Sequence, residues 1–291
     1  MRLTQEQLQT FREQGFLCLD DHFSLTEIET LRAQLPSIFK REGLGRIVEA
    51  EGGVVRSVYG PHLKNEIFQR LSRHPRILEP SIQILESPVY LYQVKINAKV
   101  AFVGDLWEWH QDYVYWLNED GMPSPRVINA AVFLDDMTEF NGPMFFIPGS
   151  HREGVFDLPN RDDFLSDPAA RPEPYRHSPA WISTVTAQLR YSFDREAIAE
   201  LVSRYGIVSP KCRAGSVIFF HPNIVHASPN NISPFDRISV VVTYNSIENI
   251  PQPKKEPRPE FLVGRNHAPL TALPDSALLT LEAEDQEGSE P

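Results

Sequence analysis

The sequence is poor in cysteine, in long apolar runs and in positive charge. Its two cysteines, Cys18 and Cys212, are too few for a disulfide framework and lack a zinc-like spacing. We therefore expect reduced, mostly buried thiols. No apolar run approaches the length that spans a membrane, and residues 1–16 lack the apolar core of a signal peptide. These absences predict a cytoplasmic protein.

Acidic residues outnumber basic ones. The 291 residues include 39 Asp and Glu against 28 Lys and Arg, which gives a net charge of −11. Nucleic acids and anionic membranes bind basic surfaces, so neither is expected as a partner. A CoA thioester is disfavoured too, because its phosphates need clusters of Lys and Arg. We expect a small-molecule substrate, and a monomer or a homodimer.

Helical patterns dominate the first part of the chain. Thr4 and Ser24 begin capping boxes, each with Gln or Glu three residues later. Pro36 is expected to end the second helix. A further helix is predicted over residues 65–74, with Pro75 as its stop.

From residue 89 onward the sequence changes to short β segments separated by Gly and Pro turns. There is no internal repeat and no regular alternation of strands and helices, which argues against a doubly wound fold. The pattern predicts a mainly β protein with added helices, built on a double-stranded β-helix (jelly-roll or cupin-like) core. The expected strands are 89–97, 127–134, 144–147, 216–220 and 237–244, and one helix near 194–203 interrupts them.

The chain is expected to form one domain over residues 1–267. Its helices would occupy about 1–85 and its β core about 86–250. Residues 152–178 are polar and Pro-rich, and are long enough to form a lid. The acidic residues 268–291 are expected to be a disordered tail.

The stretch W-E-W-H-Q-D-Y-V-Y-W, residues 107–116, holds three of the four Trp around His110 and Asp112. Such crowding indicates either a packed core or a pocket wall around ligands. Alternate residues of a strand point to one side, so His-x-Asp can offer two ligands. A non-haem Fe(II) site needs two His and one carboxylate. This pair is favoured over His151 and Glu153, which follow a turn and have no aromatic wall.

The second histidine ligand must come from a later strand. His221 and His226 are both candidates, and His226 is favoured because Arg237 and Ser239 follow it closely. If the co-substrate is a dicarboxylate such as 2-oxoglutarate, its far carboxylate needs a buried cation, and Arg offers a bidentate fork.

Together these motifs resemble the Fe(II)/2-oxoglutarate dioxygenases of the phytanoyl-CoA dioxygenase superfamily, and especially its bacterial ectoine and free amino-acid hydroxylases. The similar segments are Y-Q-V-K-I-N, W-H-Q-D-Y-V-Y-W, N-G-P-M-F-F-I-P-G-S-H-R, H-A-S-P-N-N and R-I-S, within residues 89–245. The resemblance implies a double-stranded β-helix with iron held by His110, Asp112 and His226.

The resemblance also implies roles around the co-substrate. Related halogenases replace the metal carboxylate by a small residue, so the presence of Asp112 favours hydroxylation. Arg237 and Ser239 match the positions that grip the distal carboxylate of 2-oxoglutarate. The positions that line this co-substrate are matched by Asn97, Gln93 and Trp107.

Two further positions match residues that contact substrate in ectoine hydroxylases. They are Trp116 and Lys95, and Lys stands where those enzymes carry Arg, which argues against ectoine itself. A free amino acid needs an anion clamp and an ammonium partner. Lys95 and Arg126 are candidates for the carboxylate, and the face of Trp116 for the cation.

The sequence therefore predicts an Fe(II)- and 2-oxoglutarate-dependent dioxygenase that uses O2 to hydroxylate an unactivated C–H bond. The predicted substrate is a free L-amino acid or a similar small zwitterion, and succinate and CO2 are released. The same iron chemistry could instead desaturate, cyclise or hydroxylate a larger natural-product intermediate. A non-catalytic jelly-roll binding protein is a third alternative, disfavoured because the ligands and Arg237 are all present.

Overall fold

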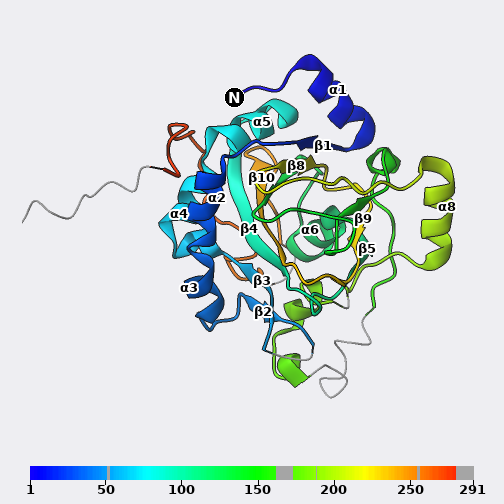
Figure 1. The fold of residues 1–291 in the computed structure, drawn as a ribbon. Coiled ribbons are helices and arrows are strands. Elements are labelled where there is room, and N and C mark those ends of the chain that lie inside the picture. The colour runs from blue at the N-terminus through cyan, green and yellow to red at the C-terminus, as the bar shows by residue number, and fades with distance from the viewer. Residues whose placement is uncertain (51–52, 162–172, 188, 254–255, 280–291) are drawn as a thin grey trace, which may run out of the picture.

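Two antiparallel β-sheets form the centre of the protein. The computed structural model describes residues 1–50, 53–161, 173–187, 189–253 and 256–279 (Figure 1). Seven strands form the large sheet, in the order β1-β8-β6-β10-β4-β3-β2, and three form the small sheet, in the order β5-β9-β7. The strands are β1 (Phe16–Leu19), β2 (Arg46–Val48), β3 (Val55–Tyr59), β4 (Val89–Lys99), β5 (Trp107–His110), β6 (Val127–Phe133), β7 (Phe145–Phe146), β8 (Val217–Phe220), β9 (His226–Ser228) and β10 (Arg237–Ser246).

Helices cover one side of the large sheet. Figure 1 shows α2 to α5 on one side of the large sheet and the small sheet on the other. This arrangement confirms the predicted mainly β fold with added helices. None of the helices in the described residues has the length and apolar character needed to cross a bilayer. The helices are α1 (Gln5–Gln14), α2 (Leu25–Arg32), α3 (Leu35–Lys40), α4 (Glu66–Ser72), α5 (Pro75–Leu85), α6 (Asp112–Asp120) and α8 (Arg195–Tyr205).

Strands β4 and β10 pair along almost their whole length and separate an apolar face from a polar one. Side chains alternate between the two faces of a sheet. Val94 and Val242 point outward and join the main hydrophobic core beneath the helices. The intervening residues point toward the small sheet. Among the register partners on this inner face are Arg237 with Lys99 and Ser239 with Asn97.

The helix starts agree with the sequence signals, but two proline stops are wrong. Both predicted capping boxes form, at Thr4 and at Ser24. Pro36 lies in the first turn of α3, after α2 has already ended at Arg32, and Pro75 is the first residue of α5. Proline is accepted in the first turn because its missing N–H would have no helical partner there.

The C-terminal segment packs against the body of the protein beyond residue 268. The backbone N–H of Leu270 donates to Val89 O at 2.8 Å, and Leu278 is 1% exposed within the main core. The expected tail therefore does not begin at residue 268. Residues 280–291 lie outside the described residues, as does the middle of the expected lid, residues 162–172.

Replacing Leu278 tests this packing. Leu278→Ala should lower the free energy of unfolding by about 2–5 kcal/mol, because it removes a buried side chain. Its neighbour Leu279 is 50% exposed, so Leu279→Ala should change stability by no more than about 0.5 kcal/mol. Urea denaturation of both variants provides the comparison, and equal effects would show that the segment is not packed.

Candidate metal centre

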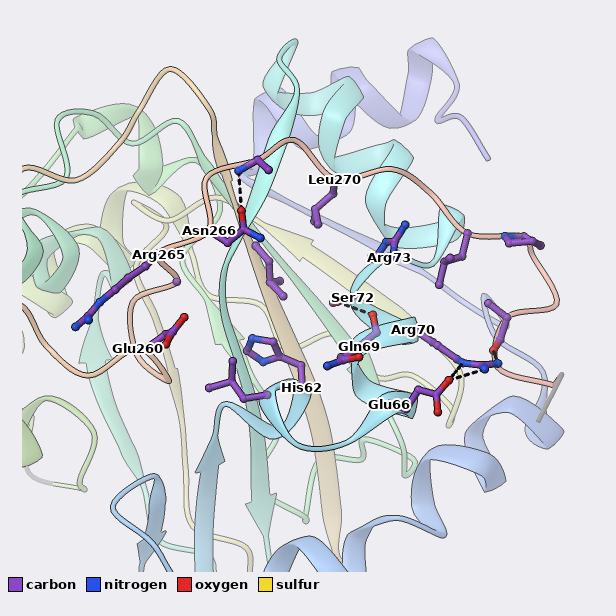
Figure 2. A pocket seen from close by; sticks show the side chains of 17 residues that line it. His62, Glu66, Gln69, Arg70, Ser72, Arg73, Glu260, Arg265, Asn266 and Leu270 are labelled. Carbon is purple, nitrogen blue, oxygen red and sulfur yellow. Dashed lines mark hydrogen bonds and ion pairs between the residues drawn. The ribbon is translucent and has the colours of Figure 1, made fainter. Parts of the chain in front are cut away.

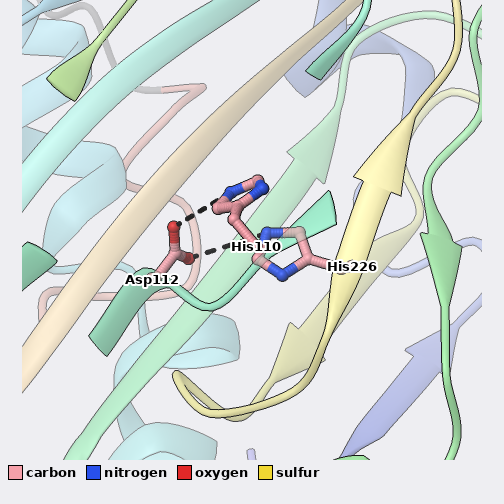
Figure 3. Close-up of side chains that lie close together, drawn as sticks. All are labelled: His110, Asp112 and His226. Carbon is pink, nitrogen blue, oxygen red and sulfur yellow. Dashed lines mark ion pairs between the residues drawn. The ribbon is translucent and has the colours of Figure 1, made fainter. Parts of the chain in front are cut away.

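Three side chains from two distant parts of the chain converge between the two sheets (Figure 3). His110 Nε2 lies 3.6 Å from Asp112 Oδ1, and His226 Nε2 lies 3.9 Å from Asp112 Oδ2. One ligand atom from each residue falls within 4.8 Å of the others, and all three residues are buried. Atoms spaced in this way can share one ion that lies about 2 Å from each of them.

Neighbouring groups orient each of these side chains. His110 Nδ1 lies 2.6 Å from Glu108 O, and His226 Nδ1 lies 3.0 Å from Ile224 O. A proton on each Nδ1 satisfies these carbonyls and leaves Nε2 as a lone-pair donor toward the centre. Asn129 donates to Asp112 Oδ2 at 2.9 Å and accepts from Thr243 Oγ1 at 2.7 Å.

The ionisation of the centre suits a cation. Burial alone raises the pKa of a carboxyl group, but Lys95 and His110 stabilise the charged form and hold the pKa of Asp112 below its usual value. Burial lowers the pKa of His226 to about 3. An anionic carboxylate beside a neutral imidazole is the state in which both groups bind a metal.

The sequence suggested that His110 and Asp112 lie on one strand, but the structure shows that they do not. His110 ends β5, and Asp112 is the first residue of α6, so the chain turns between the two ligands. Gln111 stabilises this turn, because its side-chain amide donates to Gly154 O at 2.8 Å and to Asn223 O at 2.6 Å. The helix also brings Trp116 back toward the centre.

A first cavity adjoins the centre and leads to Arg237. His110 and His226 line this cavity together with Arg237 and Ser239. Arg237 is 3% exposed, and its Nη2 donates to Gly142 O at 2.5 Å and to Ser228 Oγ at 3.1 Å. The other lining residues are Lys95, Asn97, Trp107, Met144, Phe220, Ala227, Ser228 and Val241.

Two buried polar atoms of this cavity have no hydrogen-bond partner among the described residues. They are Nε of Arg237 and Oδ1 of Asn97. Burial lowers the pKa of Arg237 to about 10, which still leaves the guanidinium charged at neutral pH. A buried cation without a carboxylate partner is costly, so this end of the cavity fits an anion.

Lys99 pairs in register with Arg237 on the neighbouring strand and was not identified from the sequence. It is 1% exposed, and its Nζ donates to Asp105 O, to Pro229 O at 2.8 Å and to Ser228 O at 3.3 Å. Burial, with the charges of Arg237 and Arg56, lowers the pKa of Lys99 to about 6. With a pKa of about 6, Lys99 is largely neutral at neutral pH, so the charge at this end of the cavity is that of Arg237.

Arg56 is a second buried residue that sequence reasoning missed. Its Nη2 donates to Leu106 O at 2.6 Å, and Nη1 pairs with Glu49 at 3.1 Å. The guanidinium also lies 3.9 Å from the centre of the Trp107 ring. Arg56 thus helps to position Trp107, which lines the first cavity and a second one.

A second cavity lies on the other side of the centre. Lys95, Trp107 and His110 line both cavities, so the two meet beside the metal ligands. The Lys95 ammonium lies 6.0 Å from the centre of the Trp107 ring. The second cavity is also lined by Tyr59, Gln93, Asp112, Tyr115, Trp116, Thr184, Val185, Leu189 and Arg258.

The charge of Arg258 is already balanced. Its Nε and Nη2 bind both carboxylate oxygens of Asp120, at 2.8 and 2.6 Å, and its Nη1 donates to Thr184. Lys95 has no ion-pair partner within 4 Å among the described residues. Lys95 is therefore the cation of this cavity that remains for a ligand.

A cavity larger than these two lies elsewhere. It opens between α4 and the C-terminal segment, and its lining includes none of the three metal-centre residues (Figure 2). Its arginines already have partners, since Arg70 pairs with Glu66 at 2.6 Å and Arg73 donates to Thr271 O at 3.1 Å. We assign no chemistry to it.

The comparisons with known proteins agree with this geometry. Residues 11–239 match the family described as phytanoyl-CoA dioxygenase (PhyH). The L-proline trans-4-hydroxylase of Streptomyces griseoviridis is 36% identical over 259 residues, which are 89% of this chain and 92% of that protein. The chain belongs to the phytanoyl-CoA dioxygenase family.

Other members of the phytanoyl-CoA dioxygenase family are similar over nearly the whole chain. An ectoine dioxygenase of Bordetella bronchiseptica is 36% identical over 272 residues, 90% of this chain and 83% of that protein. The crystal structure of EctD from S. alaskensis with 2-oxoglutarate and 5-hydroxyectoine has a TM-score of 0.76 and 28% identity, and the match covers 93% of this chain and 87% of that one. The predicted family, jelly-roll fold and enzyme class are confirmed.

The structure brings together most of the site residues named from the sequence. Only Arg126 lies apart: it is on the surface, paired with Glu248 at 2.5 Å, and lines neither cavity. The structure gives no support to its expected contact with substrate. The residues found in the two cavities or at the centre are His110, Asp112, His226, Arg237, Ser239, Asn97, Gln93, Trp107, Lys95 and Trp116.

The competing histidines lie outside the triad. His151 contacts the end of α1, where its Nε2 lies 3.1 Å from Arg12 O, and its ring lies 5.2 Å from that of His221. The two rings therefore contact each other beside α1, away from the metal triad. This placement agrees with the preference for His226 over His221.

A matched pair of variants tests the metal assignment. His226→Gln should weaken Fe(II) or Co(II) binding by more than about 100-fold. Loss of a residue that only orients a metal ligand already weakens binding by about 10–100-fold, and His226 is itself a ligand. His221→Gln should bind the metal like the unaltered protein. Anaerobic titration of both variants gives the affinities, and equal affinities would contradict the assignment.

Proposed function

We propose that this member of the phytanoyl-CoA dioxygenase family is an Fe(II)- and 2-oxoglutarate-dependent hydroxylase of a free L-amino acid or a similar small zwitterion. The observation that carries the proposal is that two residues of the metal triad, His110 and His226, line the same cavity as the buried Arg237. A metal site and an anion site in one cavity match 2-oxoglutarate, which has a metal-chelating end and a distant carboxylate.

The groups present fit both the metal and the co-substrate. Two imidazoles and one carboxylate are the ligand set of non-haem Fe(II) oxygenases. The unpartnered Nε of Arg237 is a donor suited to a carboxylate oxygen. When bound, iron and 2-oxoglutarate supply the oxidising chemistry, which consumes O2, releases succinate and CO2 and converts a C–H bond to C–OH.

The chain itself supplies binding, orientation and exclusion of water. His110, Asp112 and His226 would hold the metal. Arg237 and Ser239 would orient the distal carboxylate, which determines how the other end reaches the metal. Asn97 and Trp107 would form part of the wall of the co-substrate site, and the buried apolar residues Met144, Phe220 and Val241 of the same cavity would exclude water. Gln93, also expected at this site, lines the second cavity instead.

The second cavity is the proposed substrate site. Lys95 offers a cation that has no carboxylate within ion-pair distance among the described residues, which suits the carboxylate of an amino acid. Trp116 is 4% exposed and offers an aromatic face to the ammonium group. Two of the similar proteins, the proline hydroxylase and the ectoine dioxygenase, are named for small amino-acid-like substrates, which supports this choice. We expect the enzyme to act in the cytoplasm as a monomer or a homodimer.

Succinate release tests the proposed function. Anaerobically purified protein, supplied with Fe(II), 2-oxoglutarate and then air, would be assayed against free L-amino acids and ectoine, with Asp112→Ala as control. One substrate should stimulate succinate release and gain one oxygen atom. A product that instead loses two hydrogen atoms favours the alternative, desaturation or cyclisation. If no small zwitterion stimulates release, a larger natural-product intermediate becomes the better candidate.

Arg237→Met tests the co-substrate site. Removing the cation from a buried charge pair costs about 2–5 kcal/mol, so the KM for 2-oxoglutarate should rise by at least about 30-fold while metal affinity is kept. Arg126→Met is the control, because an exposed ion pair contributes no more than about 1 kcal/mol. Unchanged co-substrate affinity in Arg237→Met would contradict the assignment.

Lys95→Met separates the two uses that this residue could have, because Lys95 lines both cavities. The proposal predicts a higher KM for the amino acid and little change in the affinity for 2-oxoglutarate measured without substrate. Calorimetry and steady-state kinetics give the two quantities. A loss of 2-oxoglutarate affinity with an unchanged substrate KM would place Lys95 on the co-substrate instead.

A further inference from the structure

The fold brings the two cysteines of the sequence into one cluster, although they lie far apart in the chain. Cys18 is on β1, the edge strand of the large sheet, and pairs in register with Ile218 of β8. Cys212 lies in the segment that leads into β8, where it forms an antiparallel bridge with Met137 through two backbone hydrogen bonds of 2.8 and 3.2 Å. Cys212 belongs to a buried hydrophobic cluster, and Cys18 packs against that cluster.

The segments around the two thiols are held against each other. The N–H of Phe23 donates to Gly215 O at 2.8 Å, and Ser216 Oγ donates to Asp20 Oδ1 at 3.5 Å. The stretch after Cys18 thus runs beside the stretch after Cys212. Both thiols border one hydrophobic cluster, and each affects the acidity of the other.

The two sulfurs differ in exposure and in acidity. Cys18 is half-buried, whereas Cys212 is buried and 8% exposed. Interaction with the Cys212 thiol lowers the pKa of the Cys18 thiol, and the same interaction raises the pKa of Cys212. Asp20 Oδ1 lies 3.9 Å from Cys18 Sγ and acts to raise the pKa of Cys18, which offsets part of this lowering. Cys18 is therefore the more accessible and the more nucleophilic of the two thiols.

We propose that Cys18 and Cys212 form an oxidation site, at which hydrogen peroxide converts the two thiols into an intramolecular disulfide. The Cys18 thiolate attacks one oxygen of the peroxide, the O–O bond breaks, and Cys18 becomes a sulfenic acid with release of hydroxide. The sulfur of Cys212 then attacks that of Cys18: the S–S bond forms, the S–O bond breaks and water leaves. In total, two thiols and one peroxide give one disulfide and two waters.

The simpler alternative is that both thiols only fill space as small apolar groups. That role predicts no reaction of Cys212 and no dependence of the Cys18 product on Cys212. The cross-link instead joins the edge strand to the segment before β8. The proposal does not depend on the iron chemistry, so its failure and the failure of the proposed function can be told apart.

Peroxide titration of the reduced, metal-free full chain tests the proposal. The intact mass should fall by two hydrogen atoms, both thiols should resist alkylation after denaturation, and a reductant should restore them. Peptide mapping should join the Cys18 and Cys212 peptides within one chain. The oxidised protein should also unfold at a higher temperature than the reduced protein, because the cross-link restricts the unfolded chain.

Two conservative variants complete the test. In Cys212→Ser, Cys18 should gain oxygen atoms and form no cross-link. In Cys18→Ser, the buried Cys212 should stay available for alkylation after the same treatment and denaturation. The proposal is overturned if Cys18 of the unaltered protein gains oxygen while Cys212 is still alkylated, if the cross-link joins two chains, or if neither thiol reacts.

Discussion

Buried positive charge between the two sheets is the constraint on which the rest of the site depends. Arg237 is buried with backbone and hydroxyl acceptors but no carboxylate within ion-pair distance among the described residues. Lys99 beside it donates only to backbone carbonyls and gives Arg237 no negative partner. Such charge is costly to bury unless an anion accompanies it. A dicarboxylate that reaches from Arg237 toward the metal centre would balance this charge, which links the fold directly to the proposed co-substrate.

The pairing of β4 with β10 positions the side chains of the site on the inner face of the large sheet. Because side chains alternate along a strand, the register that pairs Arg237 with Lys99 also pairs Ser239 with Asn97 and Val241 with Lys95 on the inner face. The residues between them form the apolar core beneath the helices. A slip of one residue would turn the polar set into that core, so the hydrophobic packing of the outer face also fixes the geometry of the site.

Much of the site could be predicted from the sequence because its residues lie on strands with readable alternation. Arg237 and Ser239 share one face of β10, and His226 lies close before them. Lys99 and Arg56 could not be predicted, because most of their partners are backbone carbonyls of loops. The helix α6 was missed because its Tyr, Val and Trp residues are typical of strands. The packed segment 268–279 was missed because backbone hydrogen bonds, which leave no sequence pattern, hold much of it.

The central claim is that one cavity binds a metal at the triad and the far carboxylate of 2-oxoglutarate at Arg237. A crystal structure of the protein with Mn(II), an inert substitute for Fe(II), and 2-oxoglutarate tests it most directly. The account predicts the metal among His110, Asp112 and His226, with a carboxylate oxygen of the co-substrate within hydrogen-bond distance of Arg237 Nε. A metal bound elsewhere, or a co-substrate that leaves Arg237 without an anion, would contradict the account.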